Sequence, residues 1–261
     1  MHSNYQATSA TCLQQAVVPS DQLPQQSGHW ALLFQRDFQL KLADTPTEKQ
    51  QTYRLRHQVY CEELAFEPAN PIGIESDTYD LRSLHYLLYH RQSQQPAGTM
   101  RTITCTNPTE RLPVERYFRN KFTQSALQPS AFSAHTICEF SRLALASSFR
   151  RQHAAEGNAI QALSAPSHHR YLAAALYLAA LEHTTLQGYQ HAYAVMAPAL
   201  ARILIRVGLP FQQISTAIEL NGLRAAYYLE LESSLKNLCS DYQLLRQVLS
   251  TQLLSAGISK M

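Results

Sequence analysis

Thr-Ile-Cys-Glu-Phe-Ser-Arg-Leu-Ala-Leu-Ala, residues 136–146, is the stretch that decides the fold. It is largely apolar and contains no glycine or proline, which predicts a strand near the middle of a sheet. Two charged residues, Glu139 and Arg142, interrupt this run. Alternation along a strand would place Glu139 and Ser141 on one face and Arg142 on the other.

Before this strand the sequence predicts a strand, a helix and a hairpin. Pro46, preceded by Asp44 or Thr45 and followed by Glu48, is typical of a helix start, and apolar residues continue at helical spacing to Leu64. The predicted strands occupy residues 34–42, 84–90 and 98–105, the last two as an antiparallel hairpin, and a short helix is predicted near 114–122.

After the central strand, residues 147–166 are polar and basic and are expected to form a loop. The elements predicted next are a buried helix at 171–186, a strand at 190–196, a helix at 198–207, a strand at 209–215 and helices over 226–255. This order predicts an α+β fold with a central mixed β-sheet flanked by helices. Residues 1–28 are expected to be a flexible tail, and residues 29–261 a single domain with C-terminal helices.

Composition excludes several classes of function. Charged residues make up 16% of the 261, and the net charge of +3 is modest. No apolar run approaches the roughly 20 residues that span a bilayer, and no signal peptide is recognisable, so we expect a cytoplasmic protein. Neither a glycine-rich phosphate loop nor interleaved basic and aromatic residues indicate nucleic acid. The cysteines are scattered without a CxxC pair, so neither a disulfide nor a zinc site is expected: Cys12, Cys61, Cys105, Cys138 and Cys239.

A series of short motifs resembles the acyl-homoserine-lactone synthases. Those enzymes carry an arginine, two aromatic residues, an Asp-x-x-Asp pair, an arginine on the following strand and Glu-x-Ser-Arg on the central strand. The matching positions here are Arg56, Tyr60, Phe66, Asp77, Asp80, Arg101, Glu139, Ser141 and Arg142.

A second resemblance, over about residues 35–232, is to a branch of the same superfamily: the acyltransferases associated with PEP-CTERM/exosortase systems and the N-acyl amino acid synthases. It rests on residues 141–144, 149–151, 194–202 and 221–224. The resemblance implies a GNAT-like fold and acyl transfer from a thioester. The sequence departs from the lactone synthases, which favour Phe and Trp where Tyr60 and Phe66 stand. The loop that holds pyrophosphate in ordinary acetyltransferases is replaced by 147–170, which leaves room for an acyl carrier protein as donor.

Glu139 is the candidate general base for aminolysis of a thioester, which requires a neutral amine. The alternative is that Glu139 only pairs with a buried arginine. Arg142 is grouped with it as a candidate catalytic residue. The thioester carbonyl would be polarised by backbone N–H groups near Leu143 to Leu145, where the central strand of this fold is splayed.

Two cations and two anions, Arg56, Arg101, Asp77 and Asp80, are expected to bind the amine substrate or to form an ion-pair lattice. We expect Arg56 to be mainly structural and Asp80 to face the substrate. Ser141 is assigned to the same substrate site. Tyr60 and Phe66 are expected to be pocket wall or core.

The acyl chain would lie against Val195, Met196, Leu200 and Leu204, although ordinary core is the alternative for each. A basic cluster is expected to meet an acidic carrier protein or CoA phosphates, or to be a solvated face. Its members are Arg150, Arg151 and Arg170, with Arg116, Arg119 and Lys121.

The sequence therefore predicts an N-acyltransferase that moves a medium or long acyl group from acyl-carrier protein or acyl-CoA, as co-substrate, to the amine of an amino acid or similar molecule. It predicts no tightly bound cofactor and no metal. One alternative is an acyl-homoserine-lactone synthase that uses S-adenosylmethionine. The other is a non-catalytic module that binds an acyl carrier or lipid.

Overall fold

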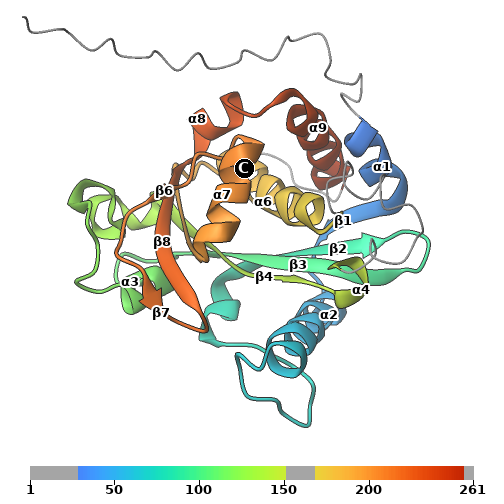
Figure 1. Cartoon of the computed structure of the whole chain (residues 1–261), viewed down its shortest axis with the longest axis horizontal. Helices are drawn as coiled ribbons and strands as arrows, with labels where there is room; N and C mark the ends of the chain where they lie inside the picture. The colour runs from blue at the N-terminus through green and yellow to red at the C-terminus, as the bar shows by residue number, and fades with distance from the viewer. Residues whose placement is uncertain (1–28, 151–167, 256–261) are drawn as a thin grey trace, which may run out of the picture.

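The computed structural model describes residues 29–150 and 168–255, which form a mixed sheet covered by helices on both faces (Figure 1). The strands are β1 (Phe38–Leu42), β2 (Ser83–His90), β3 (Gln95–Thr104), β4 (Ile137–Leu145), β5 (His191–Met196), β6 (Gln212–Gln213), β7 (Ile218–Glu219) and β8 (Leu223–Glu230). Their order in the sheet is β1-β2-β3-β4-β5-β8-β6, and β7 pairs with β8. Only β4 and β5 run parallel among these pairs. The α+β fold with a central mixed sheet is thus confirmed.

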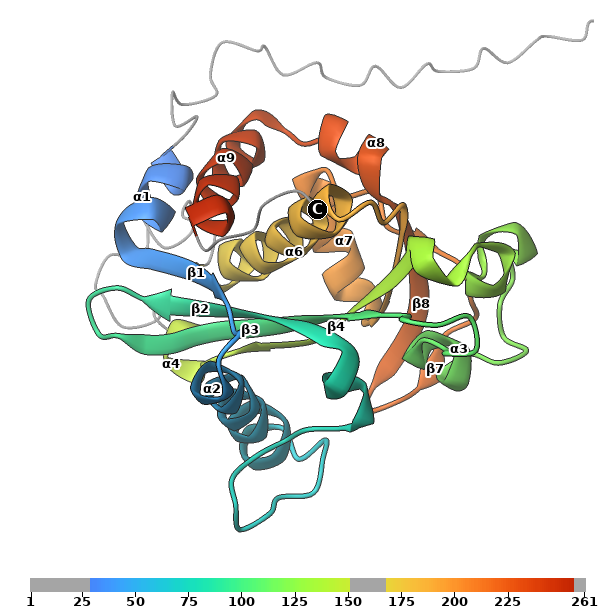
Figure 2. The ribbon, with the colours of Figure 1, turned by 180° about the vertical axis from the view of Figure 1, so that it is seen from behind.

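The helices lie on opposite faces of this sheet. They are α1 (His29–Asp37), α2 (Pro46–His57), α3 (Pro113–Tyr117), α4 (Ser147–Arg150), α6 (His168–Leu186), α7 (Pro198–Val207), α8 (Leu231–Lys236) and α9 (Ser240–Ser255). Helix α2 covers one face, and α1, α6 and α9 lie on the other (Figure 2). A π-helical turn, Gln58–Glu63, extends α2, and a 3-10 helix, Thr78–Arg82, leads into β2.

The start of α2 has the capping arrangement that its sequence predicts. The Glu48 backbone N–H donates to the Thr45 side chain, and the Thr45 N–H donates to the Glu48 carboxylate. Pro46 occupies the first turn, where a missing N–H costs nothing. Local chemistry alone is therefore enough to begin this helix.

The parallel pair β4–β5 separates partway along its length. Its pairing runs from Ile137↔His191 to Phe140↔Ala194 and goes no further. Strand β4 continues to Leu145 beside β3, and β5 continues to Met196 beside β8. The sheet is therefore open between its two central strands, at the end where both of them finish.

A β-bulge lies in β4 at the same place. The register passes from Thr99↔Ala144 to Arg101↔Ser141, so two residues of β4 face one residue of β3. One of the two, Arg142, has a left-handed backbone with φ of +54°. The expected placement of Arg142 by simple alternation is therefore wrong, because the bulge interrupts the two-residue period.

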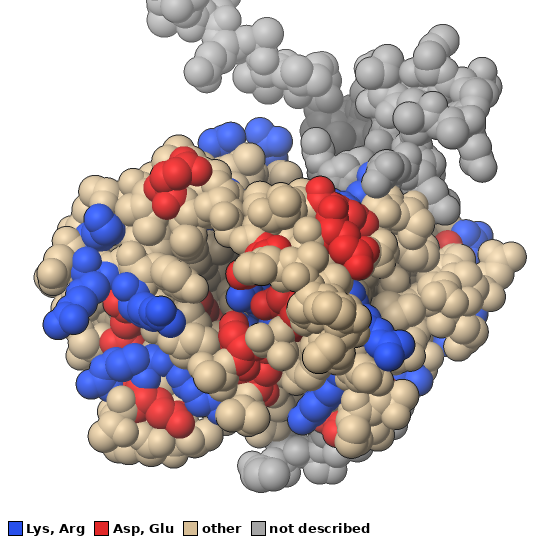
Figure 3. All heavy atoms as spheres, turned by 90° about the horizontal axis from the view of Figure 1, so that it is seen from below, with Lys and Arg blue, Asp and Glu red and all other residues tan. Residues whose placement is uncertain are grey.

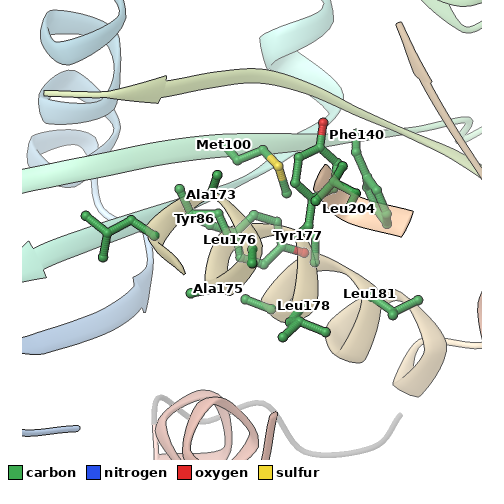
Figure 4. Close-up of a cluster of buried hydrophobic side chains, with 14 of the residues drawn as sticks. Tyr86, Met100, Phe140, Ala173, Ala175, Leu176, Tyr177, Leu178, Leu181 and Leu204 are labelled. Carbon is green, nitrogen blue, oxygen red and sulfur yellow. The ribbon is translucent and has the colours of Figure 1, made fainter. Parts of the chain in front are cut away.

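Helix α6 forms the centre of the main core (Figure 4). From Leu172 to Leu181 every residue is buried, against the sheet on one side and α9 on the other. Five small alanines are interspersed among the leucines of this stretch, which lets the helix approach the strands closely. The predicted buried helix is confirmed.

Two predicted elements differ from the structure. Residues 34–37 are helical, because Ala31 and Phe34 are buried one turn apart and α1 ends only at Asp37. Residues 223–230 form β8, where the sequence indicated a helix from 226. Its residues Ala225 to Leu229 are all buried, so both faces are covered and no alternation is visible in the sequence.

Smaller differences concern lengths. Helix α3 ends at Tyr117, before the predicted limit of 122, and only Gln212–Gln213 of the predicted strand 209–215 is a strand. The predicted tail, residues 1–28, and most of the predicted loop, residues 151–167, lie outside the described residues. Within the described ranges, no helix is long and apolar enough to cross a membrane.

Candidate active site

A cavity of about 330 Å³ lies where β4 and β5 separate. It is lined by residues from the α2 extension, β3, β4, β5, α7 and the β7–β8 turn. The predicted site residues that line it are Tyr60, Phe66, Asp77, Arg101, Glu139, Ser141, Arg142, Leu143, Val195, Met196 and Leu200. Residues as far apart in the chain as Tyr60 and Arg224 thus meet because the sheet opens here.

Glu139 is a buried carboxylate in the wall of this cavity, with 2% of its surface exposed. Its Oε2 accepts a hydrogen bond of 2.8 Å from the backbone N–H of Val114. Burial raises the pKa of Glu139 to about 7, and the Val114 N–H offsets this only partly. Among the described residues, no arginine or lysine makes an ion pair with it, so the arginine pairing that the structural alternative requires is absent there.

Arg101 lies on β3, opposite Ser141 of the neighbouring strand β4. It connects β3 to the acidic loop, which is the segment that carries Asp77 and Asp80. Its Nε donates to Ser141 Oγ at 3.0 Å, and its two Nη atoms donate to both carboxylate oxygens of Asp77 at 2.7 and 2.8 Å. It also donates to Asp80 at 2.6 Å. Ser141 is therefore a support for Arg101 as well as a part of the cavity wall.

Arg56 is 1% exposed and forms the buried centre of the ion-pair network. It donates to Glu75 at 2.5 Å and to both oxygens of Asp80 at 2.7 and 3.1 Å. Burial alone would raise the pKa of Asp80, but the hydrogen bonds and charge of Arg56, together with the charge of Arg101, lower it instead. The structural reading of Arg56 agrees with this geometry.

The expected placement of Asp80 is corrected. Asp80 is buried behind the network and does not line the cavity, whereas Asp77 does. Asp80 turns inward because Arg56 and Arg101 both bind it. Sequence spacing could not distinguish these two carboxylates.

Arg142 reaches the same acidic group from the bulge. Its Nη2 lies 3.1 Å from Glu67, 3.1 Å from Glu75 and 3.4 Å from Asp77. Its guanidinium stacks over the ring of Tyr60, with 5.6 Å between the guanidinium carbon and the ring centroid. Its charge is thus fully balanced by carboxylates.

Leu143 and Leu145 have different surroundings. Leu143 lines the cavity, and its carbonyl oxygen accepts a hydrogen bond of 2.6 Å from the Tyr60 hydroxyl. Leu145 is buried beside Gly98, where an added Cβ would lie 2.6 Å from a Leu145 methyl carbon. Of the predicted carbonyl-polarising segment, only its start at Leu143 therefore borders the cavity.

The predicted acyl-binding residues lie in two different environments. Val195, Met196 and Leu200 line the cavity, but Leu204 is one turn further along α7 and fully buried in the core. Sequence reasoning missed Tyr177, whose ring rises from α6 toward the strands (Figure 4) and lines the cavity. Among the described residues its hydroxyl has no hydrogen-bond partner. Nothing in the sequence separates Tyr177 from the buried residues around it.

The described members of the predicted basic cluster lie apart from one another. Arg150 is paired with Glu63, and helix α4, which carries it, lies at the opposite end of the sheet from α3 in both views (Figures 1 and 2). Arg116 and Arg119 border a second cavity of about 450 Å³ beside α3. Arg151 and the Arg170 side chain lie outside the described residues, and Lys121 is exposed. Figure 3 shows basic and acidic side chains interspersed on the face seen from below, the acidic ones mainly near its middle.

In the described ranges, no group of three or more His, Cys, Asp or Glu side chains is arranged to hold a metal ion. Cys61, Cys105, Cys138 and Cys239 are free thiols, and none of them lines the cavity.

The comparisons with known proteins agree with this geometry. Residues 55–158 match the acetyltransferase (GNAT) domain family. No curated protein matches the sequence significantly. The crystal structure of TofI in a ternary complex with an inhibitor and MTA is similar with a TM-score of 0.57 and 15% identity, covering 79% of this chain and 96% of TofI.

Two further solved structures are similar. BjaI, a CoA-dependent acyl-homoserine lactone synthase with MTA bound, has a TM-score of 0.56 at 18% identity, covering 85% of this chain and 92% of BjaI. FeeM, an N-acyl amino acid synthase from uncultured soil microbes, has a TM-score of 0.53 at 14% identity, covering 77% of this chain and 94% of FeeM. At these identities the likeness establishes a shared fold.

The opened sheet has the fold of a GNAT domain, and residues 55–158 match the GNAT domain family; together these findings support the class of acyltransferase. Within that class, its structural neighbours are acyl-homoserine lactone synthases and an N-acyl amino acid synthase.

Proposed function

We propose that this chain is an N-acyltransferase that moves a medium or long acyl group from an acyl-carrier protein or acyl-CoA thioester to the amine of an amino acid or similar small molecule. The observation that carries this proposal is Glu139, a buried carboxylate with its pKa raised to about 7, in the wall of a cavity between the separated strands. A base with such a pKa can accept a proton near neutral pH.

The reaction is aminolysis of a thioester. The amine nitrogen attacks the carbonyl carbon, a C–N bond forms, and the C–S bond then breaks to release a thiol. Glu139 takes the proton that the nitrogen loses. The released thiolate must also gain a proton, and the Tyr177 hydroxyl, which lines the same cavity without a partner among the described residues, is positioned to supply it or to donate a hydrogen bond.

The open sheet gives the donor a place to bind. Beyond Phe140 and Ala194 the facing edges of β4 and β5 are unpaired. An extended arm that contains amides, as CoA and acyl-carrier proteins both have, can hydrogen-bond to such edges. Val195, Met196 and Leu200 supply an apolar wall for the acyl chain.

S-Adenosylmethionine is a second candidate for the acceptor. The BjaI structure with SAM and isopentyl-CoA has the same fold, which makes S-adenosylmethionine an acceptor to test for this chain too. The association with PEP-CTERM/exosortase systems, the cytoplasmic location and a single domain over 29–261 stay predictions.

The proposal is tested by measuring thiol release from acyl-CoA and acyl-carrier thioesters of increasing chain length. Each donor is combined with pooled amino acids, with S-adenosylmethionine, or with no acceptor, using wild type and Glu139→Gln. We expect amine-dependent release from wild type and a loss of about 100-fold or more in the variant. Mass spectrometry of the product then names the acceptor, and methylthioadenosine would identify the S-adenosylmethionine reaction.

No thiol release with any pair, together with measurable binding of acyl carrier or lipid, would overturn the enzymatic proposal. The protein would then be the non-catalytic binding module that the sequence left open.

A further inference from the structure

Three arginines line the active-site cavity, and two of them are already balanced. Arg101 is held by Asp77 and Asp80, and Arg142 by Glu67, Glu75 and Asp77. Adding the buried Arg56, these three guanidiniums face four carboxylates, those of Glu67, Glu75, Asp77 and Asp80. The network therefore has no spare positive charge for an incoming anion.

Arg224 is the third arginine, and its surroundings are different. It is the second residue of the long strand β8, opposite Ile218 in the β7–β8 hairpin. Its guanidinium stacks on Phe66, with 5.9 Å between the guanidinium carbon and the ring centroid, and one Nη donates to the Leu223 carbonyl at 3.1 Å. Among the described residues no carboxylate forms an ion pair with it.

The position of Arg224 is held by its neighbours. The Asn221 side-chain amide donates to the Phe66 carbonyl at 3.2 Å, which ties the hairpin turn to the loop that carries Phe66. Gly222 has φ of +88°, and a Cβ there would lie 3.2 Å from an Nη of Arg224. The turn therefore packs closely against the guanidinium, and Arg224 lines the cavity.

We propose that Arg224 binds the carboxylate of the acceptor, so that the acceptor is an α-amino acid or another amine that carries a carboxylate. This inference rests on the proposed function and specifies its substrate class. A guanidinium offers paired N–H donors that match the two oxygens of a carboxylate. The acceptor's amine would then be directed toward Glu139, which lines the same cavity.

The charge balance favours one carboxylate over a phosphate group. Besides Arg224, the cavity is lined by the two balanced arginines and by the carboxylates Glu67, Asp77 and Glu139. A single guanidinium without an ion-pair partner among the described residues can pair with one carboxylate, whereas a dianion would add a second negative charge beside these carboxylates.

The test compares acceptors that differ only at the carboxylate. Initial rates are measured with pooled amino acids and with the matched pool of amino acid amides, for wild type, Arg224→Gln and Arg224→Lys. Arg206→Gln is the matched control, since Arg206 is exposed on α7 and does not line the cavity. We expect Arg224→Gln to lower kcat/KM for the amino acids by about 10- to 100-fold, as for a lost charged hydrogen bond, and to leave the amides within about threefold. Arg224→Lys, which keeps a positive charge, should retain more activity with the amino acids than Arg224→Gln.

A binding measurement separates this inference from the proposed function. Titration calorimetry with N-decanoylglycine and its carboxamide needs no turnover. We expect the free acid to bind wild type at least about tenfold more tightly than the amide, and this preference to vanish in Arg224→Gln. S-Adenosylmethionine carries the same α-amino carboxylate, and methylthioadenosine release distinguishes it as the source.

Two outcomes would overturn the assignment of Arg224. One is equal binding of acid and amide by the wild type, and the other is an acid preference that survives in Arg224→Gln. If transfer is absent with every amine but the acid preference depends on Arg224, the anion site stands and the proposed reaction falls.

Discussion

Asp80 accepts a hydrogen bond of 2.7 Å from the backbone N–H of Asp77, and both carboxylates belong to one capped 3-10 turn. The two carboxylates nevertheless make different contacts. Asp80 points inward to Arg56 and Arg101, whereas Asp77 holds Arg101 from the cavity side and is partly exposed. One turn thus joins the buried ion-pair network to the active site.

Replacing Asp80 by Asn is expected to destabilise the fold strongly. The change leaves Arg56 and Arg101 without a shared buried counter-charge, and breaking a buried pair in this way costs about 3–5 kcal/mol of unfolding free energy. Urea denaturation measures this loss of unfolding free energy. Asp77→Asn is the matched variant, and we expect a smaller loss of stability because Arg101 keeps Asp80. A loss from Asp77→Asn as large as that from Asp80→Asn would contradict this division.

Activity is expected to rise with pH through the pKa of Glu139. Only the carboxylate form can accept a proton, and burial places this pKa at about 7. The pH profile of kcat/KM should therefore show an apparent pKa near 7 on its acidic side, and Glu139→Gln should lack that limb. A wild-type profile that stays flat between pH 5 and 8 would exclude Glu139 as the base.

The raised pKa of Glu139 also predicts how the stability of the protein depends on pH. Its folded pKa is raised above the ordinary value near 4.5, so its contribution to stability is present at low pH and is lost as pH rises through about 7. Glutamine does not ionise. The melting temperature of Glu139→Gln relative to wild type should increase between pH 5 and pH 8, by the equivalent of up to about 3 kcal/mol. A difference that is independent of pH would contradict a raised pKa.

Tyr177→Phe is expected to reduce turnover without destabilising the protein. Tyr177 lines the cavity and its hydroxyl has no hydrogen-bond partner among the described residues, so removing the hydroxyl leaves no other group unsatisfied. We expect kcat to fall by about tenfold, with an unchanged melting temperature. Tyr86→Phe is the control, because the buried Tyr86 hydroxyl bonds to His183 at 3.1 Å outside the cavity. That variant should lose about 1 kcal/mol of stability and keep its activity.

Leu200 and Leu204 lie one turn apart on α7 and should respond differently. Leu200 lines the cavity, so Leu200→Trp is expected to shift donor preference toward shorter acyl chains. Leu204 is fully buried in the core, so Leu204→Ala should cost about 2–5 kcal/mol without changing chain-length preference. Rates over the donor series and denaturation of both variants measure these effects. An unchanged preference in Leu200→Trp would place the acyl chain elsewhere.

Several features of this protein follow from the sequence by itself, because they depend on neighbouring residues. The Thr45–Glu48 capping box starts α2, and Pro198 and Gly208 bound α7, where Gly208 has φ of +99°. The apolar run of residues 136–146 and the motif order likewise predicted the fold class and half of the residues that line the cavity.

Other features depend on contacts between distant parts of the chain. Strand β8 is covered on both faces, so its residues show no strand period, and its pairing with β5, β6 and β7 makes it a strand. The bulge brings Arg142 to the acidic loop, and Arg56 draws Asp80 inward while Asp77 stays at the cavity. Tyr177 and Arg224 belong to the site only because the sheet opens between β4 and β5 and the β7–β8 hairpin borders that opening. Such placements arise from packing and charge pairing across the tertiary structure, and no local pattern in the sequence encodes them.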